Sequence, residues 1–268
     1  MSRSGDAAAE RELADRIFAE HEARERFRPV RGALRPATMA AGYRVQDRLN
    51  ARFAAAGRGP IAGYKVGLTS AKIRRLWGVH EPIAGSIYQS GVHRSPATLN
   101  LADFMRLGIE FELAVEMARD VPLNAPPLDA ESVAAYVAAC MPAFELIEDR
   151  NADFDDLDAL SILVDNSWCG GIVLGEARRG WRDLDLKTTP VAMSLNGALV
   201  ENGVTGDAMG HPFESVAWLA GLLAGQGKQL RAGMIIMTGS TLATRFPRAG
   251  EEYSYEITGL GTVSAAIN

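Results

Sequence analysis

The sequence is poor in the residues that build disulfide scaffolds and histidine-based metal sites. It contains 2 Cys and 4 His among 268 residues. Cys140 and Cys169 are too few for a disulfide framework, and the histidines lack the regular spacing of zinc ligands. Two unpaired thiols are typical of a reducing compartment. We therefore predict a cytoplasmic protein without a disulfide and without zinc.

Long apolar runs and an excess of basic residues are also missing. No run reaches the roughly 18 apolar residues that a membrane helix needs, and the N-terminal segment MSRSGDAAAERELADR is charged rather than apolar. We expect neither a membrane span nor a secretory leader. The formal net charge is −5 and the isoelectric point is about 5.5, which favours neither nucleic acid nor an anionic membrane as a partner.

Several common catalytic fingerprints are absent as well. The chain has no Walker or dinucleotide-binding motif and no GxSxG nucleophile elbow. Ser167 and Ser240 have no identifiable base, so covalent catalysis is disfavoured. His211 stands before a proline, where capping of a helix is its expected use.

What is present indicates a large core, because 47% of the residues are hydrophobic. Residues 7–56 carry two helical patterns, and further helices are predicted at about 129–140 and from 211 to 225–227. Strands are predicted at 61–68, 109–117, 144–148, 171–174, 191–195, 198–201, 234–238, 253–257 and 262–267. Many strands with few crossover helices predict an α+β fold, with a mixed sheet or a barrel-like β core.

The segment GIEFELAVEM, residues 108–117, carries an unusual pattern for a strand. Apolar residues alternate with Glu110, Glu112 and Glu116, which is the period of a half-buried strand, although glutamate is a poor strand former. Glu110 and Glu112 share one face, and Glu145 in PAFELIEDR stands in another apolar strand. Three carboxylates suit a hard divalent cation. The alternative is that the glutamates of residues 108–117 form the solvated face of an edge strand.

Lys65, in GYKVGLT, is a cation in a short strand between glycines that allow close backbone approach. Such a lysine can meet a substrate carboxylate or stabilise an enolate. The alternative is a lysine that extends from the edge of a strand into water.

Taken in order, the segments GYKVGLTS, GIEFELAVEM, PAFELIEDR, DNSWCGGIVLG, GHPFESVAWLA and IIMTGS with AGEEYSYEITGLGTV resemble the hydratase/decarboxylase family of the fumarylacetoacetate hydrolase superfamily. The resemblance covers about residues 63–267. It implies a mixed β-roll catalytic domain at 99–268 and a small helical N-terminal domain at 1–98. It also implies a homo-oligomer.

Residue by residue, the resemblance places Mg2+ or Mn2+ on Glu110, Glu112 and Glu145, and a catalytic lysine at Lys65. It also implies that five polar residues face the substrate: Asp165, Asn166, Ser167, Ser240 and Thr241. The implied reaction is the hydration of a small 2-hydroxy-2,4-dienoate of the 2-keto-4-pentenoate type to a 4-hydroxy-2-oxo acid, as in the catabolism of aromatic compounds.

One departure from the family pattern keeps an alternative open. Hydratases of this family carry an aspartate after the proline of a P-D-aromatic-G segment, whereas this chain reads Glu81-Pro-Ile-Ala-Gly85. Related decarboxylases of 4-oxalocrotonate carry an apolar residue there, so decarboxylation is the second expectation. Hydrolysis of an acylpyruvate and an inactive partner subunit that binds small acids are further alternatives.

Overall fold

The computed structural model describes the chain from residue 3 to residue 268. Its N-terminal part is helical, as predicted. Apolar residues of α1 (Arg3–Glu22) and α2 (Met39–Phe53), among them Leu13 and Phe53, form a small core together with Tyr88 and Val164. Thr38 caps α2, because its hydroxyl accepts a hydrogen bond from the backbone of Ala41 at 3.1 Å.

Shorter helices connect the strands that follow. They are α3 (Ala71–Leu76), α4 (Ala130–Val133), α5 (Ala159–Val164) and α6 (Pro212–Gly225). His211 caps α6 as predicted, since its Nδ1 accepts a hydrogen bond from the backbone N–H of Phe213 at 3.0 Å. None of the helices in the described part of the chain has the length and apolar character that a bilayer crossing needs.

A seven-stranded mixed sheet forms the centre of the described chain, in the order β2-β1-β10-β5-β6-β7-β3. Its strands are β1 (Ile61–Gly67), β2 (Ile83–Tyr88), β3 (Val92–Arg94), β5 (Leu107–Met117), β6 (Val137–Glu148), β7 (Cys169–Leu174) and β10 (Ile235–Ser240). Three of these strands precede residue 98. The division of the chain at residue 98 stays a prediction.

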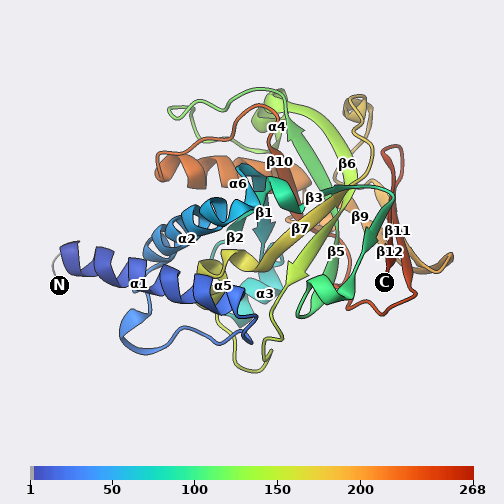
Figure 1. Cartoon of the computed structure of the whole chain (residues 1–268). Helices are drawn as coiled ribbons and strands as arrows, with labels where there is room; N and C mark the ends of the chain where they lie inside the picture. The colour runs from blue at the N-terminus through green and yellow to red at the C-terminus, as the bar shows by residue number, and fades with distance from the viewer. Residues whose placement is uncertain (1–2) are drawn as a thin grey trace.

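A second sheet of five strands lies beside the first, in the order β4-β12-β11-β8-β9. Its strands are β4 (Ala97–Leu99), β8 (Pro190–Leu195), β9 (Ala198–Val204), β11 (Glu252–Ile257) and β12 (Gly261–Ile267). Figure 1 shows α1, α2 and α6 on one side of the central sheet and the strands of the second sheet on the other. The α+β class is confirmed, and both sheets are open, so the barrel-like alternative is wrong.

The main core lies between the two sheets. Phe111 of β5 packs against Phe144 of β6 and against Tyr255 of β11, with ring centroids 5.6 and 5.7 Å apart. All three rings are fully buried. Because side chains alternate along a strand, the opposite face of β5 is left for Glu110 and Glu112.

The central sheet curls so that its two ends approach each other. β2 and β7 are separated by four strands in the sheet order, and yet they are in contact. The Asn166 side chain joins β2 to the turn before β7: it accepts from the Ser86 N–H at 2.7 Å and donates to the Ser86 carbonyl at 2.9 Å. Side chains from several strands of the curled sheet therefore share one enclosed space.

The helix predicted at 129–140 is wrong over its last four residues, which are strand. Asp129 does cap a helix, but α4 ends at Val133, a single 3-10 turn covers Ala134–Tyr136, and β6 begins at Val137. The strand is buried between β5 and β7, and its first four residues, Val137–Cys140, are all apolar. A short run that is apolar throughout has no period that separates strand from helix.

Candidate functional site

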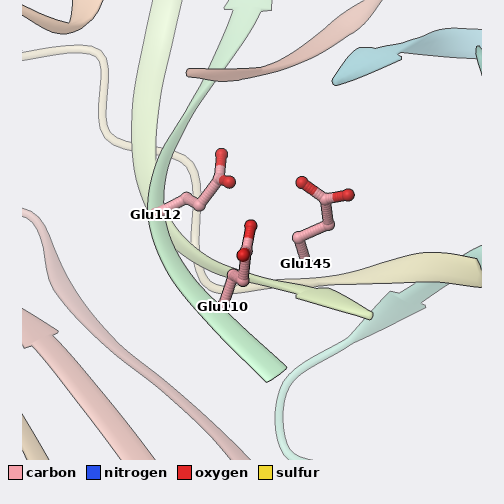
Figure 2. A group of neighbouring side chains, drawn as sticks. All are labelled: Glu110, Glu112 and Glu145. Atoms are coloured by element: carbon pink, nitrogen blue, oxygen red, sulfur yellow. The ribbon is translucent and has the colours of Figure 1, made fainter. Parts of the chain in front are cut away.

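Three carboxylates meet where β5 and β6 pair. The two strands are antiparallel, and their register sets Glu110 directly opposite Glu145 and Glu112 opposite Ala143. Two like charges placed opposite each other on neighbouring strands are destabilising unless something neutralises them. The small Ala143 leaves room on the same face. Figure 2 shows the three glutamates, which extend from the two strands toward one point.

The carboxylates fit a divalent cation. One oxygen of each residue lies within 4.8 Å of the others. Glu112 and Glu145 are fully buried, and Glu112 Oε1 and Glu145 Oε2 accept no hydrogen bond from the described residues. Buried carboxylate oxygens without partners are costly, and a hard cation such as Mg2+ or Mn2+ satisfies such oxygens.

Lys65 reaches this cluster from β1. Its Nζ lies 2.9 Å from Glu145 Oε1, and its side chain is 5% exposed. Gly67 allows the close backbone approach that was predicted for the glycines beside Lys65. A Cβ at Gly67 would stand 3.1 Å from Lys65 Nζ. Three carboxylates and one ammonium leave two negative charges, which is the charge that a divalent cation neutralises.

The net effect of burial and of the excess of negative charge is to shift the pKa values of Glu112, Glu145 and Lys65 upward. Burial raises the pKa of Glu145 to about 7; the neighbouring Lys65 opposes the rise and Glu110 adds to it. Burial, together with Glu145 and Glu110, also raises the pKa of Glu112 well above its usual value. For Lys65, burial lowers the pKa, but Glu145 and Glu110 outweigh it and the net shift is upward. In the metal-free protein the lysine therefore carries a positive charge.

Two contacts that the sequence pattern did not predict hold the carboxylates in place. Thr244 Oγ1 donates a hydrogen bond to Glu110 Oε1 at 2.7 Å, and the backbone N–H of Gly239 donates to Glu112 Oε2 at 2.8 Å. Gly239 has φ +104°, and a Cβ there would lie 2.4 Å from the Thr69 side chain. Glycine is the residue that tolerates both conditions.

The predicted substrate residues at 165–167 are occupied by contacts within the protein. Asp165 pairs with Arg150, Nη2 to Oδ2 at 3.0 Å, and with His21, Nε2 to Oδ1 at 2.5 Å. Asn166 bonds the backbone of β2, and Ser167 Oγ donates to the Ala84 carbonyl at 2.9 Å. Asp165 and Asn166 line a cavity of about 350 Å³ whose walls include neither the three glutamates nor Lys65.

The predicted residues Ser240 and Thr241 lie closer to the carboxylates. Ser240 pairs with Glu112 across β10 and β5. Its hydroxyl donates to the Leu242 carbonyl at 2.9 Å, and that of Thr241 lies 3.0 Å from the Phe111 carbonyl oxygen. In this conformation both hydroxyl groups are engaged by protein atoms.

Ile83 lies on the same side of the sheet as Lys65. In the antiparallel pair of β1 and β2, Ile83 stands opposite Gly67, and Lys65 stands opposite Gly85. A Cβ at Gly67 would lie 3.6 Å from Ile83 Cγ1, and Ile83 is 1% exposed. An apolar side chain therefore occupies the space next to the ammonium group.

This fold and this site define a class of proteins. Residues 84–268 match the family model described as "Fumarylacetoacetate (FAA) hydrolase C-terminal". The chain belongs to the fumarylacetoacetate hydrolase family.

Particular relatives are similar over most of the chain. A 4-oxalocrotonate decarboxylase of Pseudomonas putida is 34% identical over 229 residues, which is 85% of each chain. A 2-hydroxyhexa-2,4-dienoate hydratase of Comamonas testosteroni is 31% identical over 206 residues, 76% of this chain and 77% of that one. The solved 4-oxalocrotonate decarboxylase from Pseudomonas putida G7, complexed with magnesium and adipate, has a TM-score of 0.89 at 29% identity and covers 100% of this chain and 99% of its own.

Proposed function

We propose that this protein is a metal-dependent hydratase that adds water to a 2-hydroxy-2,4-dienoate and yields a 4-hydroxy-2-oxo acid. The observation that carries the proposal is the buried set of Glu110, Glu112 and Glu145 with Lys65 beside it. The hydratase relative at 31% identity acts, by its name, on a substrate of this kind. The expected setting is the catabolism of aromatic compounds.

Glu110, Glu112 and Glu145 would hold the cation, Mg2+ or Mn2+. When bound, such an ion acts as a Lewis acid toward a chelating 2-oxo acid. The chain supplies the geometry: Thr244 and Gly239 fix the orientation of two carboxylates, and the pairing of β5 and β6 fixes the third. Held in this way, the ligands need little reorganisation when the charge of the substrate changes.

Lys65 keeps a positive charge at the edge of the carboxylate cluster. Its Nζ is within contact distance of Glu145 and is shielded from water. From that position the ammonium group would stabilise negative charge on the substrate carboxylate or on an enolate oxygen. Five residues stay candidates for substrate contact: Ser240, Thr241, Asp165, Asn166 and Ser167. For each of them, that contact requires release of a bond made within the protein.

Decarboxylation of a 4-oxalocrotonate-type acid is the second candidate, and Ile83 favours it. Ile83 is buried beside Lys65 and brings no proton donor to a position where one would assist hydration. The decarboxylase relative at 34% identity and the solved decarboxylase at TM-score 0.89 also support this alternative.

Two broader properties accompany the proposal. A homo-oligomer is expected from the family resemblance. A cytoplasmic location is supported by Cys140 and Cys169, which are buried and unpaired.

The deciding experiment is a paired assay with Mg2+ or Mn2+. One arm follows the loss of ultraviolet absorbance from freshly generated 2-hydroxypenta-2,4-dienoate, and the other follows carbon dioxide release from 4-oxalocrotonate. Each arm has a chelator control. Metal-dependent formation of 4-hydroxy-2-oxopentanoate supports the hydratase. Carbon dioxide release without hydration replaces it with the decarboxylase.

A further inference from the structure

The face of β5 that carries the glutamates continues into an aromatic surface. Alternation along the strand puts Gly108 next to Glu110 on that face. A Cβ at Gly108 would lie 3.2 Å from Ile147 Cβ and 3.6 Å from Phe246 Cε1. Phe154 adjoins Phe246, with ring centroids 6.2 Å apart. We call Gly108, Ile147, Phe154 and Phe246 the aromatic shelf.

The shelf is directly connected to the carboxylate cluster. Ile147 follows Glu145 on the same face of β6. Thr244, whose hydroxyl donates to Glu110, stands two residues before Phe246. Because Gly108 has no side chain, Ile147, Thr244 and Phe246 pack directly against the strand backbone beside Glu110.

The two aromatic rings of the shelf are exposed. Phe154 is 54% exposed and Phe246 is 48% exposed. Adjacent exposed aromatic side chains mark a binding surface more often than isolated ones do. Among the described residues, the exposed aliphatic pair Leu199 and Val200 lies on β9, in the other sheet.

The shelf carries no unbalanced charge of its own. The Arg106 guanidinium lies 5.1 Å from the ring centroid of Phe154 and 5.3 Å from that of Phe246. Arg106 Nε donates to both carboxylate oxygens of Asp149 at 2.8 Å, and Asp149 is fully buried. Because this buried carboxylate neutralises the guanidinium, the surface favours an apolar or aryl group over a second carboxylate.

The spacing matches a substrate tail. Because a strand rises about 3.4 Å per residue, Gly108 and Glu110 are about 7 Å apart along β5. An acid whose carboxylate and 2-oxo oxygens are held at the glutamates, and whose chain lies along β5, would reach the shelf with its far carbons.

We propose that Phe154 and Phe246 select 2-oxo and 2-hydroxydienoate acids that carry an alkyl or aryl group at the end farthest from the carboxylate. This inference rests on the proposed function of the same site. It assigns the tail of the substrate to the shelf and its acid end to the metal ligands.

The test is a binding measurement that needs no turnover. Calorimetry of the Mn2+-loaded protein compares 2-oxobutanoate with 2-oxo-4-phenylbutanoate. The wild type binds the phenyl acid about tenfold more tightly, which is the gain expected from one favourable aromatic contact. Phe154→Ala and Phe246→Ala reduce that ratio toward one, Phe246→Leu keeps part of it, and the control Leu199→Ala leaves it unchanged.

Two results overturn the inference. One is an equal ratio in the wild type and both alanine variants; if the wild type still hydrates 2-hydroxypenta-2,4-dienoate, only the shelf is wrong. The other is a change of subunit number in the alanine variants, seen by light scattering, which would assign the rings to a subunit contact. Absence of metal-dependent turnover with the tenfold ratio intact would instead overturn the hydratase and leave the shelf as a binding surface.

Discussion

At the scale of single residues, the burial of Glu112 and Glu145 lowers the stability of the metal-free protein, and a bound cation would remove that cost. Both are fully buried and have oxygens without hydrogen-bond partners among the described residues. We expect Glu112→Gln to lower Mn2+ affinity by at least about 100-fold, because it removes a direct ligand. Stability without metal should be unchanged or higher, since a buried charge is lost.

The matched control for this substitution is Glu116→Gln, on the same strand but outside the cluster. Calorimetric titration with Mn2+ and urea unfolding in a chelator measure the two effects. Unchanged Mn2+ affinity in the Glu112 variant would contradict a role in metal binding.

Lys65 is the only basic residue in contact with these carboxylates among the ion pairs of the described residues. We expect Lys65→Met to destabilise the metal-free protein by about 3 kcal/mol, because it leaves buried negative charge without a partner. Added Mg2+ should recover a large part of that loss. Urea unfolding with and without Mg2+ measures both quantities. An equal loss in the two conditions would show that Lys65 contributes packing rather than charge.

At the scale of elements, Asp165 joins α1 to the end of β6 in the central sheet. This carboxylate, buried at the end of α5, pairs with His21 of α1 and with Arg150 after β6. Burial opposes ionisation, but His21 and Arg150 outweigh it and lower the pKa of Asp165 below its usual 3.8. The stabilisation is therefore complete above about pH 4 and is lost as the pH falls through the lowered pKa.

We expect Asp165→Asn to cost about 3 kcal/mol at pH 7, because the buried Arg150 loses its nearer carboxylate and keeps only Glu20, at 3.5 Å. The difference from the wild type should shrink below about pH 4. The control Asp156→Asn, which removes an exposed partner of Arg31, should change stability by less than about 0.5 kcal/mol. Urea unfolding across this pH range tests both, and a difference that grows on acidification would refute the assignment.

Some strands could be predicted from the sequence and others could not, depending on how each strand is buried. β5 was predictable because one of its faces is apolar and the other polar, so the period of two is visible. β6 was partly mistaken for a helix because it is buried on both faces. β2 was not predicted at all: its six residues are all buried, and it begins directly after Pro82.

For the site, the sequence predicted which residues belong to it but not how they contact one another. The resemblance named Glu110, Glu112 and Glu145, and the structure brings them together. The pairing of Glu110 with Glu145 is a matter of strand register, which no local pattern in the sequence fixes. The contact of Thr244 with Glu110 joins residues 134 positions apart, and no sequence motif around Thr244 predicts it.

At the scale of the whole molecule, folding and metal binding are linked through the same carboxylates. A ligand that binds the native state at 100 times its dissociation constant stabilises that state by about 2.7 kcal/mol. For a chain of this size we expect a rise of roughly 5–10 °C in the unfolding midpoint. Scanning calorimetry with excess Mg2+, against a chelator and against Ca2+, measures it; no shift with any of these ions would argue against a metal site.

The size of that rise should depend on pH in a defined direction. Without metal, the raised pKa of Glu145, about 7, means that the folded protein holds a proton which the unfolded chain releases near its usual 4.5. The metal-free protein therefore loses stability as the pH rises from about 4.5 to about 7. A cation must displace that proton, so its affinity and its stabilising effect increase over the same range. We expect the Mg2+-induced rise in the midpoint to be larger at pH 8 than at pH 6, and the raised pKa of Glu112 should act in the same direction. A rise that is equal at both pH values would mean that Glu145 is ionised before the metal binds.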